Sequence, residues 1–297
     1  MSFQLMIHGG AGTVPNKKAY APHIENILQA GQKALAQEQS AIDVVELCVM
    51  LLEDDPTFNA GKGSVLNHKG TIDMDAAIMD GKNMSAGSVA GVQYIANPIH
   101  LARYVRDYSD HVMLIGEGAM EFAQLHQFSQ QPLDYFITER RYNQWLEAQK
   151  SDTTSLDHSH SDKKMGTVGA VARDIHGNLA AATSTGGITN KKFGRVGDTP
   201  LIGAGVFAEN ETCAVSATGY GEQFIRTTLS RTVSEFIRYR GMTAQEASQA
   251  AINYLVDKVN GIGGIITIDY QGNLGAAHSS QDLLHGKATE STYIALT

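Results

Sequence analysis

The pattern of apolar and polar residues predicts strands and helices in separate groups. Apolar runs with β character predict strands over residues 3–7, 72–79, 88–95 and 111–115, near Val168, Leu179, Leu201 and Cys213, and over residues 262–270, 274–278 and 292–296. The first strand stops at a glycine loop, residues 8–13. Because strands are bunched separately from helices and do not alternate with them strictly, the pattern favours an α+β fold built in layers.

Apolar residues at helical spacing predict helices over residues 23–37, 40–52, 97–106, 117–127, 138–149 and 221–239, with one more after Thr243. Ser40 is an N-cap with Asp43 three residues later, and Thr243 forms a capping box with Glu246. The helix after Ser40 is apolar nearly all round, which indicates burial.

One short motif occurs twice in the chain. Residues 173–182 resemble residues 268–277, and both contain Asp-x-x-Gly-Asn-Leu. We interpret both segments as the same hairpin turn and not as a repeat array.

The composition suits a globular enzyme with many tight turns: 297 residues, 42% hydrophobic, 18% charged, with 30 glycines. The net charge of -8 argues against nucleic acid or an anionic membrane as partner. Cys48 and Cys213 are the two cysteines, too few for a disulfide framework. We find no signal peptide pattern and no apolar run of membrane-spanning length, so we expect a cytoplasmic protein.

The joint between Gly166 and Thr167 is the most distinctive point of the sequence. Residues 151–164 are almost wholly Ser, Thr, Asp, His and Lys, which predicts a flexible linker over residues 151–166, whereas a buried strand starts at Thr167. A threonine hydroxyl needs a base beside it to act as a nucleophile, and a chain break before Thr167 would supply its own α-amino group. The plain alternative is an ordinary hairpin strand after an ordinary linker.

Three further polar clusters contain residues that could assist such a nucleophile or bind its substrate. Thr185 ends the strand that pairs back from Thr167, so its hydroxyl could orient Thr167 or relay its proton, or could simply belong to a turn. Arg195 and Asp198 could hold the α-carboxylate and α-amine of an amino acid, or could form an ion pair. Thr218 could stabilise an oxyanion, or could cap a helix.

Together these motifs resemble the plant-type asparaginase and isoaspartyl peptidase family of N-terminal nucleophile (Ntn) hydrolases. The matching segments are residues 8–12 (HGGAG), 58–63 (FNAGKG), 74–81 (MDAAIMDG), 166–172 (GTVGAVA), 183–187 (TSTGG), 194–198 (GRVGD) and 217–219 (ATG). They span nearly the whole chain in the family's order. Each motif alone has little specificity, but the ordered combination is highly specific.

The resemblance implies a four-layer αββα sandwich, made as a single-domain precursor that cleaves itself between Gly166 and Thr167. Residues 1–166 would be the α-subunit and residues 167–297 the β-subunit. Two cleaved protomers would assemble as an (αβ)2 heterotetramer.

The resemblance also implies roles for single residues. Thr167 would be the nucleophile, Thr185 its supporting hydroxyl, and Thr218 with the Gly219 amide the oxyanion hole. The implied substrate-binding residues are Arg195, Asp198, Gly219 and Gly221, and the implied supporting residues are Asn59, Gly9 and Gly10. A structural sodium is implied at the main-chain carbonyls of Leu52, Glu53, Asp55, Phe58, Ala60 and Lys62. No cofactor is expected for catalysis.

If Arg195 and Asp198, which we call the clamp, bind both α groups of a small-molecule substrate, the amide that is cleaved must lie on the substrate's side chain. L-Asparagine and β-aspartyl dipeptides fit this geometry, and both would release L-aspartate. Two alternatives stay open. A glycosylasparaginase would share the fold and nucleophile but act on sugar-bearing asparagine, and an uncleaved amino-acid-binding protein would keep only the clamp.

Overall fold

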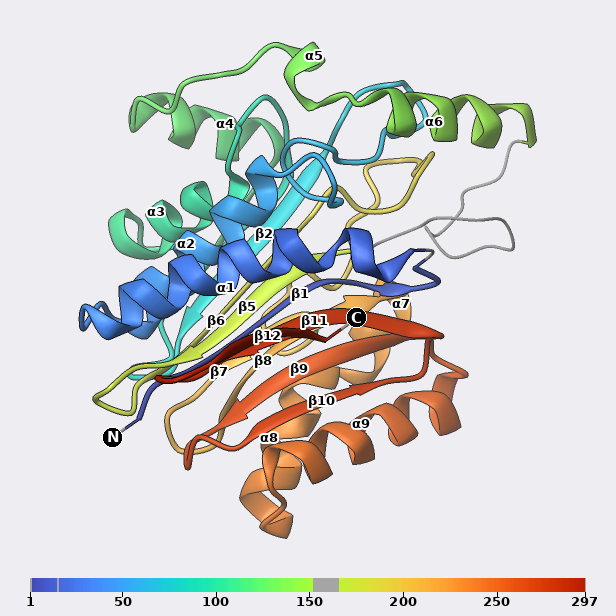
Figure 1. Cartoon of the computed structure of the whole chain (residues 1–297). Helices are drawn as coiled ribbons and strands as arrows, with labels where there is room; N and C mark the ends of the chain where they lie inside the picture. The colour runs from blue at the N-terminus through green and yellow to red at the C-terminus, as the bar shows by residue number, and fades with distance from the viewer. Residues whose placement is uncertain (1, 15, 152–165, 297) are drawn as a thin grey trace.

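A computed structural model describes residues 2–14, 16–151 and 166–296, so most of the predicted linker, residues 152–165, lies outside the described residues. Two β-sheets stack face to face, and helices cover both outer faces (Figure 1). The larger sheet has eight strands in the order β12-β11-β1-β5-β6-β2-β3-β4, and the smaller has four in the order β10-β9-β8-β7. The predicted αββα sandwich is confirmed.

The strands of the larger sheet are β1 (Gln4–Gly12), β2 (Met74–Asp80), β3 (Ala86–Val92), β4 (Met113–Ile115), β5 (Val168–Arg173), β6 (Leu179–Thr185), β11 (Asp282–Ala288) and β12 (Tyr293–Leu296). Those of the smaller sheet are β7 (Val206–Ala208), β8 (Cys213–Gly219), β9 (Gly263–Asp269) and β10 (Leu274–His278). Among the described strands, all neighbours pair antiparallel except β3 and β4. The hairpin β5–β6 therefore lies in the middle of the larger sheet.

Helices form the outer layers. A 3-10 turn η1 (Lys17–Ala19) leads into α1 (Ala21–Ala36), α2 (Ala41–Asp54) and α3 (Pro98–Tyr108), which pack on the larger sheet. The next three are α4 (Gly116–Leu125), α5 (Leu133–Phe136) and α6 (Glu139–Ser151). After α7 (Gly221–Thr227), the helices α8 (Leu229–Arg240) and α9 (Ala244–Val259) cover the smaller sheet (Figure 1).

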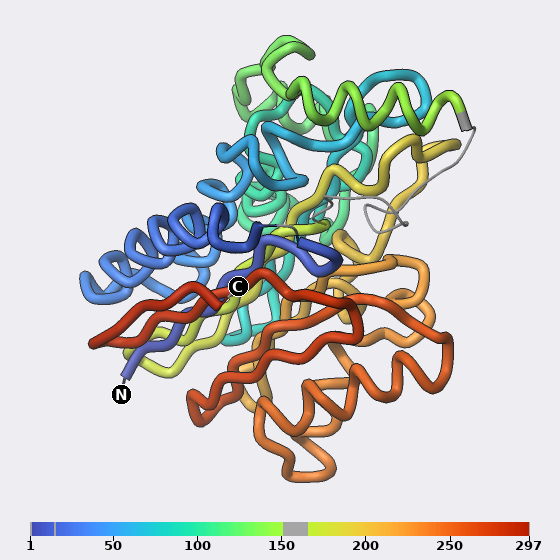
Figure 2. Tube along the Cα trace, turned by 45° about the vertical axis from the view of Figure 1, so that its right-hand side comes forward, coloured from blue at the N-terminus to red at the C-terminus, as the bar shows by residue number. Residues whose placement is uncertain are grey.

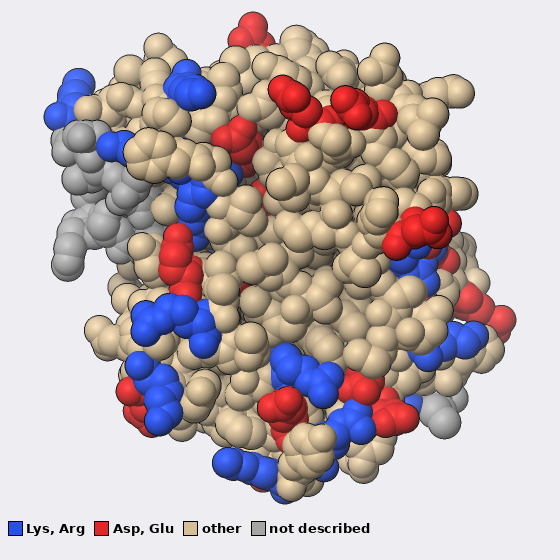
Figure 3. Space-filling model, turned by 180° about the vertical axis from the view of Figure 1, so that it is seen from behind, with Lys and Arg blue, Asp and Glu red and all other residues tan. Residues whose placement is uncertain are grey.

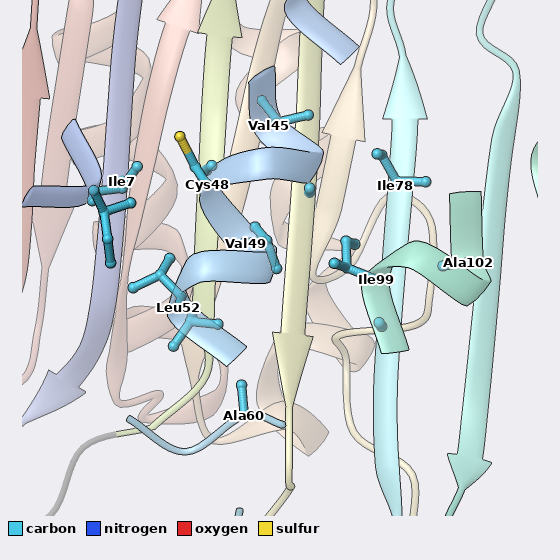
Figure 4. Close-up of a cluster of buried hydrophobic side chains, with 14 of the residues drawn as sticks. Ile7, Val45, Cys48, Val49, Leu52, Ala60, Ile78, Ile99 and Ala102 are labelled. Carbon is cyan, nitrogen blue, oxygen red and sulfur yellow. The ribbon is translucent and has the colours of Figure 1, made fainter. Parts of the chain in front are cut away.

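Apolar side chains fill the spaces between the layers. Between the helices and the larger sheet, Cys48 and Leu52 of α2 point into a cluster with Ile7 and Ile99 (Figure 4). A second cluster between the two sheets contains many small side chains, and a third lies between the smaller sheet and its helices. The predicted burial of the helix after Ser40 is thus confirmed.

The predicted caps are present, but three predicted elements differ from the structure. Ser40 accepts the Asp43 amide, and Thr243 forms its capping box with Glu246. The segment predicted as one helix over 221–239 is two helices, because Thr228 has left-handed backbone (φ 43°) between α7 and α8.

The strand predicted near Leu201 is wrong, because residues 198–205 form turns and β7 begins at Val206. The expected glycine loop is wrong as well. β1 continues to Gly12 with a shift in register between His8 and Gly10, so Gly9 is the extra residue of a bulge.

None of the described helices has the length and apolarity needed to cross a bilayer. On the face shown in Figure 3, acidic and basic side chains lie close to one another around a broad uncharged centre. That face therefore presents no continuous basic surface.

Candidate active site

The hairpin β5–β6 brings two threonine hydroxyls together at its open end. Thr167 immediately precedes β5 and Thr185 ends β6, and both are buried. Oγ1 of Thr167 donates a hydrogen bond to Oγ1 of Thr185 at 3.2 Å. The amide of Gly187 donates to the same Thr185 oxygen at 3.0 Å. The nitrogen of Thr167 is a peptide amide in the continuous chain, and only a chain break before Thr167 would give it a free α-amine that could act as a base.

A pocket opens over these hydroxyls and contains most of the predicted site. Its lining residues are Gly166, Thr167, Thr185, Gly187, Ile188, Arg195, Gly197, Asp198, Thr199 and Gly219. The structure thus unites residues from the joint before β5, the end of β6, the loop after β6 and the end of β8. Polar groups that converge in a small pocket are what a binding site for a small polar molecule requires.

The two predicted supporting glycines have different neighbours. Gly10 has φ 120°, and a Cβ there would lie 2.6 Å from the nitrogen of Gly166. The main chain of β1 therefore passes directly against the Gly166–Thr167 joint. Gly9 instead packs on Phe58, whose ring would lie 2.5 Å from a Cβ at Gly9.

Asn59 is buried beside the pocket and holds the turn that follows Thr185. Its Nδ2 donates to the carbonyl of Gly187 at 2.8 Å, and its Oδ1 accepts the amide of Val65 at 3.0 Å. Asn59 does not line the pocket, so any effect on Thr167 would pass through this turn.

Thr218 lies at the end of β8 and is fully buried. Its Oγ1 accepts the amide of Ala11 at 3.3 Å, which leaves its own proton available to another acceptor. The alternative role as helix cap is wrong, since Tyr220 is the N-cap of α7 and makes no side-chain cap. The next residue, Gly219, reaches the pocket itself.

Arg195 lies in the pocket wall, and its partner is Glu222. Nε and Nη2 each donate to one oxygen of the Glu222 carboxylate at 2.8 Å. Burial would lower the pKa of Arg195, but the hydrogen bonds and charge of Glu222 outweigh it and raise that pKa. The alternative of a simple Arg195–Asp198 ion pair is therefore wrong. Glu222 itself was not predicted as a site residue.

Asp198 is buried in the pocket wall near Arg195. Among the described residues its Oδ2 has no hydrogen-bond partner. Burial raises the pKa of Asp198 to about 7, and the Arg195 charge acts in the opposite direction. A Cβ at Gly221 would lie 2.8 Å from Oδ1 of Asp198, so a glycine there leaves room for the carboxyl group. An unpartnered acidic oxygen in a pocket is suited to an ammonium group.

His8 is a buried histidine of β1 that sequence reasoning did not single out. Its Nε2 lies 2.8 Å from Oγ of Ser216, which lies 2.8 Å from Oγ1 of Thr183. Burial and then the charge of His285 lower the pKa of His8 to about 3, so its imidazole is neutral at physiological pH. Histidine within a strand has no sequence signal that would distinguish such a role.

In the loop after α2, where a sodium ion was predicted, two of the predicted carbonyls, those of Glu53 and Asp55, accept main-chain amides. The Glu53 carbonyl accepts the Lys62 amide at 2.7 Å. A Cβ at Gly61 would lie 2.5 Å from the Glu53 carbonyl oxygen, and one at Gly63 would lie 2.8 Å from that of Phe58. These contacts do not test the sodium site, which stays a prediction.

Comparisons with known proteins find relatives over nearly the whole chain. The family model described as asparaginase matches residues 1–296. The chain is 44% identical to the isoaspartyl peptidase of Escherichia coli over 94% of this chain and 90% of that protein. It is 43% identical to the isoaspartyl peptidase of Salmonella typhimurium, over 94% and 93%, and 43% identical to the human isoaspartyl peptidase/L-asparaginase, over 94% and 91%.

Proposed function

The chain belongs to the asparaginase family, and from this and the pocket geometry we propose that it is an amidohydrolase for β-aspartyl (isoaspartyl) dipeptides and L-asparagine. The observation that carries the proposal is the 3.2 Å contact between the Thr167 and Thr185 hydroxyls in a pocket shared with Arg195 and Asp198. Hydrolysis of either substrate would release L-aspartate.

We propose that the chain first cleaves itself at the Gly166–Thr167 joint. Oγ1 of Thr167 would attack the Gly166 carbonyl carbon, the C–N bond would break, and the nitrogen would take up a proton. Water would then hydrolyse the resulting ester, which frees the carboxylate of Gly166 and restores the hydroxyl. The product is a Thr167 with both a hydroxyl and an α-amine, whose ordinary pKa of about 8 leaves a useful neutral fraction near pH 7.

In the cleaved enzyme, the amine of Thr167 would accept the hydroxyl proton while Oγ1 attacks the side-chain amide carbon. The Thr218 hydroxyl and the Gly219 amide would stabilise the oxyanion, because the Thr218 oxygen accepts the Ala11 amide and its own proton is available for donation. The amine would pass the proton to the departing ammonia or amino acid. Water would then hydrolyse the acyl-enzyme and release aspartate.

The clamp explains why the side-chain amide would react. Arg195 would bind the α-carboxylate, either beside Glu222 or in its place, and Asp198 would bind the α-ammonium. An α-linked aspartyl peptide has its α-carboxyl group in an amide and would lose the contact to Arg195. The proposed enzyme should therefore distinguish β-linked from α-linked dipeptides.

The first test is intact mass and gel analysis of the purified chain after incubation, beside Thr167→Ala and the exposed control Thr13→Ala. We expect fragments 1–166 and 167–297 from the unmodified chain and the control, and an intact Thr167→Ala. Both cleaved proteins should hydrolyse β-aspartyl leucine and L-asparagine but not α-aspartyl leucine. A chain that stays whole and inactive would instead favour the amino-acid-binding protein, and faster turnover of N-acetylglucosaminyl asparagine would favour a glycosylasparaginase.

We also propose a structural sodium in the loop after α2, held by the carbonyls of Leu52, Glu53, Asp55, Phe58, Ala60 and Lys62. The ion would fix the loop that carries Asn59. Replacement of sodium by choline should lower the Tm by several degrees and lithium should restore it less well than sodium. An unchanged Tm across these salts would contradict this site.

The proposed assembly is an (αβ)2 heterotetramer working in the cytoplasm. Light scattering on the cleaved enzyme should give twice the 31.9 kDa of one chain. A mass of one chain would contradict the assembly, and recovery of the enzyme outside the cytoplasmic fraction of its cells would contradict the location.

A further inference from the structure

Lys191 is a buried lysine to which no role has been assigned so far. It is 2% exposed, although an ammonium group is costly to bury without partners. It lies in the loop between β6 and β7, and the same loop supplies Gly187, Arg195 and Asp198 to the pocket. Lys191 is therefore a buried side chain of the loop that forms much of the pocket wall.

The ammonium group of Lys191 is tied to the beginning of β2. Its Nζ donates to the main-chain carbonyl of Asp73 at 2.6 Å. Burial lowers its pKa, and the charges of Asp75 and Asp73 act against this lowering. Asp75 is fully buried, with Oδ1 accepting the Gly91 amide at 2.9 Å and Oδ2 without a partner among the described residues. A buried cation and a buried carboxylate thus share one enclosed region.

This region lies next to Thr185, across the strand pair β2–β6. Asp75 of β2 is the register partner of Thr185 in β6. A Cβ at Gly187 would lie 2.8 Å from Nζ of Lys191, so the ammonium occupies the space against Gly187. The Gly187 amide donates to Oγ1 of Thr185, which accepts the hydroxyl of Thr167. Lys191 is therefore connected to the nucleophile through one glycine and one threonine.

The loop has other attachments that do not depend on the lysine side chain. Gln144 and Gln149 of α6 donate to Thr189 at 2.6 Å and to the Asn190 side chain at 2.9 Å. In Figure 2 the yellow loop after β6 rises toward the light green α6. These contacts should keep the loop folded when the ammonium is removed, so the effect should be confined to the Gly187 turn.

We propose that Lys191 is a positioning residue for the reaction. Its ammonium, bound to the Asp73 carbonyl and near the Asp75 carboxylate, fixes the Gly187 turn so that the Gly187 amide holds Thr185 against Thr167. The inference rests on the proposed Thr167 nucleophile. Since Thr185 acts on the chemical step, loss of the ammonium slows catalysis and self-cleavage more than it weakens substrate binding.

The test compares Lys191→Met, Asp75→Asn and their double variant with Lys69→Met, an exposed lysine in a nearby loop. In cleaved, folded protein, Lys191→Met should lower kcat for β-aspartyl leucine by about 10- to 100-fold and leave KM within about threefold. Asp75→Asn should also lower kcat, and the double variant should lose no more than the worse single variant, because the two groups act together. Lys69→Met should match the unmodified enzyme.

Three results would overturn the inference. They are a kcat of Lys191→Met within threefold of the unmodified enzyme, a rise in KM at constant kcat, and a loss of activity in both single variants that only follows their loss of folded protein by circular dichroism. Failure of the proposed function would appear in the unmodified enzyme, whereas failure of this inference appears only in the variants.

Discussion

The hairpins β5–β6 and β9–β10 turn in the same way. Asp174 and Asp269 are both buried, and Oδ1 of each accepts the amides of the residues two and four positions later at 2.9–3.0 Å. Oδ2 of each accepts the first amide of a helix, Ala41 of α2 or Ala244 of α9. The repeated Asp-x-x-Gly-Asn motif is thus one structural device that joins a hairpin to a helix in each outer layer.

The opposite ends of the two hairpins differ completely. The first hairpin begins after Thr167 and ends at Thr185, both buried and joined by a hydrogen bond. The residues at the same distance from the second turn are Ile262, which is 45% exposed, and Ser280. The comparison teaches that the shared motif specifies architecture, whereas the chemistry depends on the residues at the strand ends.

Removing one hydroxyl at the open end of each hairpin should give the largest difference in kcat between the two hairpins. Thr185→Ala removes the acceptor of the Thr167 hydroxyl and should lower kcat for β-aspartyl leucine by about 100-fold or more. Ser280→Ala, its counterpart in the second hairpin, should stay within about twofold, because Ser280 is not among the residues that line the pocket. Steady-state kinetics on cleaved protein measure both. Equal losses in the two variants would contradict a site confined to the first hairpin.

Removing the turn aspartates should affect stability in both hairpins alike. Asp174→Ala and Asp269→Ala each leave three backbone amides without their acceptor and should cost about 2–3 kcal/mol. Urea unfolding in the uncleavable Thr167→Ala background measures the free energy of unfolding. The Asp→Asn variants keep one acceptor oxygen and should lose less. A large loss at only one of the two positions would show that the turns are not equivalent.

The contrast also explains how far sequence reasoning reached. The repeated turn and the Thr167–Thr185 proximity could be predicted, because strand pairing across a short hairpin is a local matter. Glu222 could not be assigned to Arg195, since that contact joins a loop residue to a residue of α7 that lies 27 positions later, after β7 and β8. β11 was missed because its sequence DLLHGKA has no continuous apolar run, and it is a strand through its pairing with β1. The pocket roles of Asp198, Thr218 and Gly219 remain predictions.

A buried acid sets the first hairpin apart in its response to pH. Ser184 donates to Oε1 of Glu53 at 2.6 Å, whereas its counterpart Ser279 donates to the Gly261 carbonyl. Burial raises the pKa of Glu53 to about 8, so the folded state holds a proton that the unfolded state releases near its ordinary pKa of 4.5. Glu53 therefore makes the free energy of unfolding fall as pH rises between these values, by at most about 1.4 kcal/mol per pH unit for this one group.

Glu53→Gln removes this titration and should make stability fall less steeply with pH between pH 6 and 7, while Asp198, whose pKa is also raised, keeps part of the slope. Urea unfolding at both values, in the Thr167→Ala background, measures the difference. Ser279→Ala in the second hairpin is the matched control and should keep the slope of the unmodified chain. The same slope in Glu53→Gln would assign the titration to another group.

Substitution of the turn glycines should have the smallest effect on stability, and the effect should be similar in both hairpins. Gly177 and Gly272 have φ 83° and 90°, where an L side chain is strained. Alanine at either position should cost about 1 kcal/mol, and the nearest atom to a Cβ at Gly272 lies at 3.6 Å, so the cost there comes from the backbone alone. Asparagine tolerates left-handed backbone better and should recover part of the loss. An asparagine variant less stable than the alanine variant in urea would locate the cost in packing around the turn and not in its backbone.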